Sequence, residues 1–160
     1  MNLFTEIRGL VLAALGQMQD AGALPAGLDM TAVTVEPPRD PAHGDMATNA
    51  AMVLAKPAGQ NPRTIADALA ARLADDPRIQ MAEVAGPGFL NLRLKPAVWQ
   101  DLVRRVLEQG ADYGRSDIGA GQKVNVEFVS ANPTGPMHVG HVRGAVVGDA
   151  LSNLLAFAGW

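Results

Sequence analysis

The stretch "KVNVEFVSANPTGPMHVGHVRG", residues 123–144, decides the fold of the C-terminal part of this chain. Residues 123–129 alternate apolar and polar side chains, which predicts a buried strand. A loop over 130–137 follows, and from His138 to about Phe157 apolar residues recur at helical spacing. A strand, a tight loop and a helix in this order are typical of the first βα unit of a Rossmann-like α/β domain.

The junction between this loop and the helix has the chemistry of a phosphate site. A helix N-terminus presents unpaired N–H groups and the positive end of its dipole, and both favour an anion. Gly140 lacks a side chain, so a purine or a ribose can lie close to the backbone there. His138 and His141 are three residues apart, so both imidazoles can reach one triphosphate and stabilise charge at its α-phosphorus. Pro133 and Pro136 fix backbone angles in the loop.

Two plainer interpretations of the histidine pair remain open. The imidazoles can form half of a metal site, but no third ligand lies nearby in the sequence, and we predict no metal. They can also cap the helix or lie on its surface. The spacing alone is weak support for a nucleotide site, whereas a glycine between the histidines, directly after "NPTGP", is more specific.

The first 110 residues mix helical and strand patterns irregularly, which predicts an α+β domain with an antiparallel sheet covered by helices. A glycine-rich segment over 111–122 is the best candidate linker to a second domain over 123–160. The expected elements of the first domain are helices over 2–20, 46–56, 61–76 and 96–109, strands over 32–36 and 88–94, and a loop over 37–45.

Composition excludes several classes of protein. Apolar residues make up 48% of the 160 residues, so a packed core is feasible. The net charge of −3 and the lack of basic blocks argue against binding nucleic acid through bulk charge. Cysteine is absent, which excludes disulfides and thiol nucleophiles. No apolar run approaches the roughly 20 residues that span a bilayer, so we expect a cytoplasmic protein with no membrane contact.

The sequence resembles a known family. "VEFVSANPTGPMHVGHVRG" is similar to the first signature of class I aminoacyl-tRNA synthetases. Its "SANPTGPMHVGHVR" part resembles the arginyl-tRNA synthetases in particular. "HGDMATNAAMVLAK", 43–56, and "GPGFLNLRL", 86–94, resemble segments of that family's N-terminal tRNA-contacting domain. The resemblance implies an arginine–tRNA ligase that uses ATP, with Mg²⁺ and without a tightly bound cofactor, to activate arginine and transfer it to tRNA(Arg).

The resemblance also implies roles by position. The ATP site would comprise Pro136, His138, Gly140 and His141, with the two histidines catalytic. Arginine would be held by Glu127, Ser130 and Asn132, whose polar groups suit an ammonium, a carboxylate or a guanidinium. The motif region consists of Ala131, Asn132, Pro133, Thr134, Gly135, Pro136, Met137, His138, Val139, Gly140 and His141.

In the first domain, Phe89 and Asn91 project from the non-leucine face of the strand over 88–94. An aromatic ring can stack on an unpaired base while an amide reads its edge, so these residues are candidates for tRNA contact. The competing explanation places Phe89 in a second small core and leaves Asn91 solvated.

One βα unit cannot bury both of its faces, so we expect the chain to be an inactive piece of a larger, monomeric ligase, prone to self-association through exposed apolar surface. Two other functions are considered. A nucleotidyltransferase of the cytidylyltransferase type shares the histidine turn, but it usually carries that turn near its N-terminus. A non-catalytic RNA-binding module is the second alternative.

Overall fold

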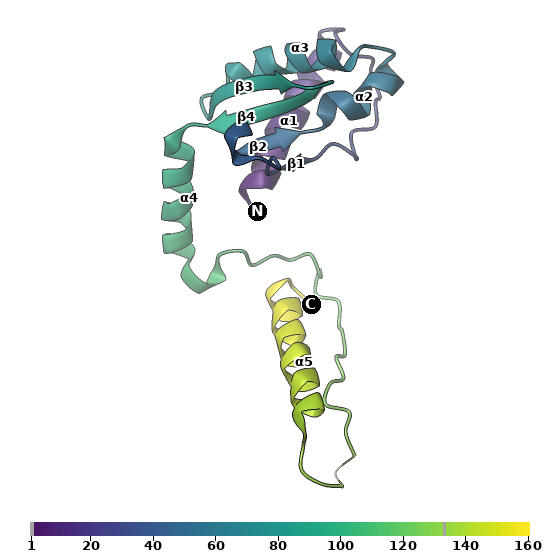
Figure 1. Cartoon of the computed structure of the whole chain (residues 1–160), viewed down its shortest axis with the longest axis vertical. Coiled ribbons are helices and arrows are strands. Elements are labelled where there is room, and N and C mark those ends of the chain that lie inside the picture. Colours follow the sequence, from purple (N-terminus) through teal and green to yellow (C-terminus); the bar gives the residue numbers. More distant parts are fainter. Residues whose placement is uncertain (1, 133) are drawn as a thin grey trace. The chain divides into compact units, whose positions relative to one another are not determined.

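The computed structural model describes residues 2–132 and 134–160, which form two compact units, Met1–Gln109 and Gly110–Trp160 (Figure 1). Pro133, part of the predicted motif region, lies outside the described residues.

The first unit is built on a four-stranded antiparallel sheet. Its strands are β1 (Val35–Glu36), β2 (Met46–Thr48), β3 (Ile79–Ala85) and β4 (Phe89–Leu94), in the spatial order β1-β2-β4-β3. Every pairing is antiparallel, and β4 lies between β2 and β3. The predicted α+β class with an antiparallel sheet is therefore confirmed.

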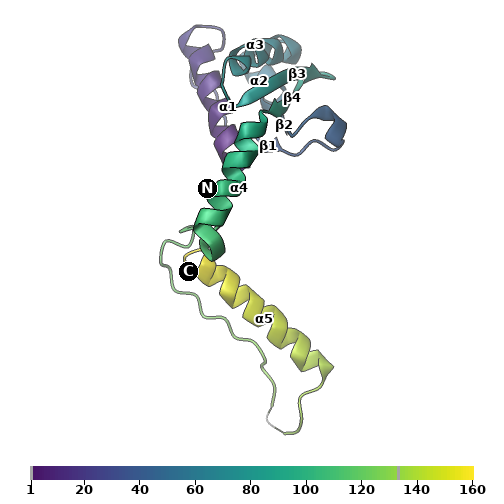
Figure 2. The same cartoon turned by 90° about the vertical axis from the view of Figure 1, so that its left-hand side faces the viewer.

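Helices cover one face of this sheet (Figure 2). Leu90, Leu92 and Leu94 alternate along β4 and are buried against them, as the period-two pattern predicts. The alternate residues of β4 therefore point to the opposite face. The helices of this unit are α1 (Leu3–Asp20), α2 (Ala50–Ala58), α3 (Pro62–Ala74) and α4 (Pro96–Gln109).

The helix starts follow from local sequence. The Asn2 side chain accepts a hydrogen bond from the Thr5 N–H at 2.9 Å and caps α1. Asn61 caps α3 in the same way through the Arg63 N–H at 2.8 Å, and Pro62 occupies the first helical position. The predicted helices over 2–20, 61–76 and 96–109 are confirmed to within two residues at each end.

Three elements of this unit differ from the prediction. The helix expected from residue 46 begins only at Ala50, because residues 46–48 pair with both β1 and β4 as β2. The strand β3 was not predicted, since "IQMAEVA" shows no clear apolar alternation and its burial is partial. The strand expected over 32–36 is limited to its last two residues.

The second unit contains one long helix, α5 (Val139–Phe157), as predicted. The expected strand over 123–129 is not formed. Val124 is 51% exposed and Phe128 39% exposed, and no second strand lies beside this segment within the described part of the second unit. A strand needs a neighbour for its backbone hydrogen bonds, so the alternating sequence does not form one here.

The segment predicted as a linker, 111–122, folds against the C-terminal end of α5 within the second unit. The N–H groups of Ser116, Gly119 and Gly121 donate to the carbonyls of residues 157, 158 and 159 at 2.9–3.2 Å. The first of these bonds satisfies a carbonyl that the last turn of α5 leaves unpaired, and the other two pair the carbonyls just after the helix.

Candidate functional site

The two motif histidines cap the N-terminus of α5. His138 occupies the N-cap position, and its Nδ1 accepts a hydrogen bond from the Gly140 N–H at 3.1 Å. His141 Nδ1 accepts from the His138 N–H at 3.4 Å, which completes a reciprocal capping box. The two rings stack with centroids 3.8 Å apart and an angle of 24° between their planes. The helix-capping interpretation of the pair is thus correct as a description of this structure.

These caps decide which ring nitrogen is free. An imidazole nitrogen that accepts a hydrogen bond carries no proton, so a neutral ring must carry its proton on the other nitrogen. The Nε2 atoms of His138 and His141 are therefore hydrogen-bond donors in their neutral form. Both donors lie beside a helix N-terminus, where an anion is favoured.

The ring of His138 leaves little room for a side chain at position 140. A Cβ at this position would lie 3.0 Å from Cε1 and 3.1 Å from Nδ1 of His138. Such contacts are closer than ordinary van der Waals packing, so a side chain here would push the ring away from its cap. The glycine between the histidines thus gives His138 room to cap the helix.

The predicted arginine-binding residues are partly brought together. The Ser130 hydroxyl donates to Glu127 Oε1 at 2.5 Å, and both residues are exposed. The exposed side chains of Asn132 and Pro136 make no hydrogen bond within the part of the chain that the structure describes. The Glu127 carboxylate therefore has an open second oxygen and a hydroxyl partner on the first.

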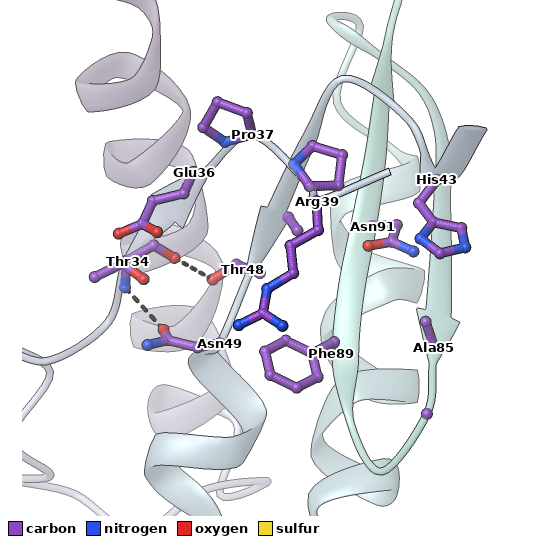
Figure 3. A pocket seen from close by; sticks show the side chains of 13 residues that line it. Thr34, Glu36, Pro37, Arg39, His43, Thr48, Asn49, Ala85, Phe89 and Asn91 are labelled. Atoms are coloured by element: carbon purple, nitrogen blue, oxygen red, sulfur yellow. Dashed lines mark hydrogen bonds between the residues drawn. The ribbon is translucent and has the colours of Figure 1, made fainter. Parts of the chain in front are cut away.

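A second candidate site is an open cavity of about 690 Å³ in the first unit, on the face of β4 that carries no leucines (Figure 3). Phe89 and Asn91 both line it, as their position on that face predicts. Phe89 is 44% exposed and Asn91 only 7%, so the competing explanation of a core Phe89 and a solvated Asn91 is wrong. The full lining is Thr34, Glu36, Pro37, Pro38, Arg39, His43, Ala47, Thr48, Asn49, Ala85, Gly86, Phe89 and Asn91.

Hydrogen bonds to the backbone fix one wall of this cavity (Figure 3). The Thr34 N–H donates to Asn49 Oδ1 at 2.8 Å, and the Thr48 hydroxyl donates to the Thr34 carbonyl at 2.7 Å. Thr48 is almost fully buried, so these bonds are shielded from water. They tie the chain before β1 to β2 and the start of α2, and the wall is held rigid.

Sequence reasoning missed the contribution of the loop over 37–45. It recognised the prolines as loop residues but assigned no role to Arg39 or His43, which line the cavity. The sequence does show a cation, Arg39, and an imidazole, His43, on a segment stiffened by prolines, and this could have marked the loop as a candidate. Only the folded chain shows that this segment lies over β4, where Arg93 Nη2 also donates to the Ala42 carbonyl at 3.4 Å.

Within residues 2–132 and 134–160, no three His, Asp or Glu side chains gather closely enough to hold a metal ion. No helix in these ranges has the length and apolar character needed to cross a membrane.

Comparison with known proteins places both units in one family. The model of the arginyl tRNA synthetase N terminal domain matches residues 5–94, more than half of the chain. The chain belongs to the arginyl-tRNA synthetase family. The model of the class I (R) tRNA synthetase catalytic domain matches residues 102–160, so the strand-like segment and α5 fall within that domain.

Individual relatives agree with this assignment. An arginine–tRNA ligase of Cereibacter sphaeroides is 81% identical over all 160 residues, and one of Paracoccus denitrificans is 74% identical over 159 residues. The chain spans only 28% and 27% of the length of these two proteins. The arginyl-tRNA synthetase of Thermus thermophilus matches 99% of this chain and 24% of its own, with 30% identity and a TM-score of 0.62. The fold is also shared with the Plasmodium falciparum arginyl-tRNA synthetase, at 17% identity, 97% coverage of this chain, 28% of the other and a TM-score of 0.65.

Proposed function

We propose that the whole protein carrying this sequence is an arginine–tRNA ligase. It joins the carboxylate of arginine to the α-phosphorus of ATP and releases pyrophosphate. It then passes the arginyl group to a terminal ribose hydroxyl of tRNA(Arg) and releases AMP. The observation that carries this proposal is the pair of imidazole donors at the N-terminus of α5, in a chain whose two units match the two domains of this one family.

ATP is proposed to lie across the N-terminus of α5, with its adenosine close to Gly140. The Nε2–H groups of His138 and His141 then donate to phosphate oxygens, because their Nδ1 atoms are engaged as caps. Charge grows on the phosphoryl oxygens as the arginine carboxylate attacks, so fixed donors lower the barrier. Pro136 belongs to the same ATP-binding loop, and Mg²⁺ accompanies the nucleotide as a further proposal.

Arginine is proposed to bind where Glu127, Ser130 and Asn132 present polar groups. The carboxylate of Glu127 suits a guanidinium or an ammonium, and its hydrogen bond from Ser130 holds it in one orientation. The amide of Asn132 can both donate and accept, which suits the substrate's charged ends.

The tRNA is proposed to place an unpaired base in the cavity on β4. Phe89 offers an exposed phenyl face for stacking, and Asn91 offers an amide for the edge of the base. This site does not rely on bulk positive charge, which agrees with the net charge of −3.

The remaining parts of the proposal concern the protein as a whole. We propose that it is a cytoplasmic monomer without membrane contact. The isolated 160 residues are proposed to be inactive and to self-associate, because α5 carries exposed apolar residues such as Val146 and Leu154.

Arginine-dependent exchange of pyrophosphate into ATP tests this function. In the whole protein, His141→Ala is expected to slow exchange by about 10²–10³-fold, because it removes one donor to the transition state. His138→Asn is the sharper variant, because asparagine is a good N-cap that keeps the helix start while removing the imidazole. Robust wild-type exchange that neither substitution slows would overturn the role of the histidines, and exchange driven by another amino acid would overturn the substrate.

A further inference from the structure

The cavity on β4 contains a buried amide with unused hydrogen-bonding capacity. Asn91 is only 7% exposed, and its side chain makes no hydrogen bond within the described residues. In the described part of the chain, no side-chain nitrogen or oxygen is both fully buried and without a hydrogen-bond partner. The polar atoms of Asn91 therefore keep some contact with solvent. The little surface that the amide retains therefore opens into the cavity that it lines. Because no protein group occupies these polar atoms, their hydrogen-bonding capacity is available to a polar ligand in the cavity.

The ring of Phe89 supplies a flat apolar surface beside this amide. It sits two residues earlier on the same face of β4, and it is 44% exposed although it stands at the edge of a well-packed domain. A ligand with a flat face and polar edges matches these two side chains together, and a nucleobase has both.

Arg39 faces Phe89 across the same cavity. In Figure 3 its side chain descends from the loop after Pro37, and its guanidinium lies toward the phenyl ring. Arg39 is exposed and makes no ion pair or hydrogen bond within residues 2–132 and 134–160. Pro37 and Pro38 restrict the backbone that carries it, so its approach to the cavity is partly fixed before any ligand binds.

A guanidinium is planar and stacks on flat π systems, which a lysine ammonium cannot do. We infer that Arg39 is a further tRNA-binding residue, whose guanidinium plane closes over a nucleobase stacked on Phe89 while Asn91 contacts its edge. This inference rests on the proposed function, because it assigns a third residue to the proposed tRNA site. With Arg39, the nucleobase would be held between two side chains, in a clamp, and not stacked on Phe89 alone.

Binding of a tRNA(Arg) transcript to the whole protein tests the clamp. Phe89→Ala and Asn91→Ala report on the site itself, and Arg39→Lys and Arg39→Gln report on the clamp. If the guanidinium stacks, both Arg39 variants weaken binding by about three- to 30-fold, since lysine keeps the charge but loses the plane. Arg72→Lys and Arg72→Gln, in the last turn of α3 and outside the cavity, are the matched controls and leave binding unchanged.

A double-mutant cycle gives the decisive measurement. If Arg39 and Phe89 hold the same base, adding Arg39→Lys to Phe89→Ala costs little more than Phe89→Ala alone. If Arg39→Lys bound tRNA as strongly as the wild type, Arg39 would contact a phosphate. If the losses from Arg39→Lys and Phe89→Ala multiplied in the double variant, Arg39 would contact another nucleotide. Either result overturns the clamp. If Phe89→Ala and Asn91→Ala both left tRNA binding unchanged, the tRNA site itself would be overturned, whatever the result at Arg39. Thermal melts check that each variant is folded.

Discussion

Phe128 packs against Gly148 of α5 so closely that a Cβ at residue 148 would lie 2.2 Å from the Phe128 Cβ. Carbon atoms in contact normally stand about 3.5–4.0 Å apart, so Gly148→Ala must displace the phenyl ring. We expect this substitution to destabilise the second unit by about 1–2 kcal/mol, since overpacking costs more than the helix gains from alanine. Amide hydrogen exchange along α5 measures the change.

Gly144→Ala is the matched control for this prediction. It lies one turn earlier on α5, and an added Cβ there meets no atom within 4 Å. Alanine at this position should stabilise the helix by about 0.5–1 kcal/mol. If both substitutions slowed exchange equally, Phe128 would not pack on this helix in solution.

Arg8 organises the chain before β1. Its Nε donates to the Val33 carbonyl at 2.6 Å, and its Nη2 lies 3.4 Å from the Thr31 carbonyl. Arg8→Met keeps the aliphatic stem but removes the charged donors, which should cost about 1.5–3 kcal/mol. Urea unfolding measures this loss, with Arg72→Met as the control because the Arg72 side chain makes no hydrogen bond in the described residues. Equal losses for the two variants would count against this role.

Asp76 gives the first unit a dependence on pH. The Arg78 side chain donates to both of its carboxylate oxygens at 2.9 Å, which lowers the pKa of Asp76 below its ordinary value of 3.8. The stabilisation is therefore fully present above about pH 4 and is lost as the pH falls through the lowered pKa. Asp76→Asn should reduce stability at pH 6 and flatten its fall between pH 6 and pH 3.

Urea unfolding at both pH values tests this sign. Asp67→Asn on α3 is the control, because Asp67 is exposed and makes no side-chain hydrogen bond among the described residues. It should leave the difference in unfolding free energy between the two pH values as in the wild type. A steeper fall with acid in Asp76→Asn than in the wild type would show that the ion pair does not stabilise the folded chain.

The sequence predicted the helices better than the strands, and the reasons are physical. A helix satisfies its own backbone, so caps such as Asn2 and Asn61 and a spacing of three to four residues mark it locally. The strands β2 and β3 have only three and seven residues with weak alternation, and they form because β4 lies between them. That pairing is a property of the folded chain and has no local signature.

The expected strand over 123–129 failed for the converse reason. Its alternation is clear, but the described part of the second unit holds no neighbouring strand to pair with it. One of its apolar residues, Phe128, packs on α5 at Gly148 instead. Alternation thus indicates which residues are apolar on one face, but it does not indicate which element will pack against them.

Some of the site residues were predictable from the sequence and others were not, for the same reason. His138, Gly140 and His141 are adjacent in sequence, so their common helix start was predictable from spacing alone. The cavity on β4 was only half predictable. Phe89 and Asn91 follow from alternation along one strand, whereas Arg39 comes from a loop that is 50 residues away in sequence and reaches the cavity only after folding.

The last prediction separates the structural role of His138 from its proposed catalytic role. Its Nδ1 accepts from the Gly140 N–H, so His138→Ala leaves that amide unpaired and should cost about 1 kcal/mol at the start of α5. Exchange of the Gly140 amide should accelerate severalfold in His138→Ala. His138→Asn should keep wild-type protection, because its side-chain oxygen can accept from the same amide. If His138→Ala left this exchange unchanged, the imidazole would not cap α5. Nδ1 would then not be an acceptor, and Nε2 would not be required to carry the proton.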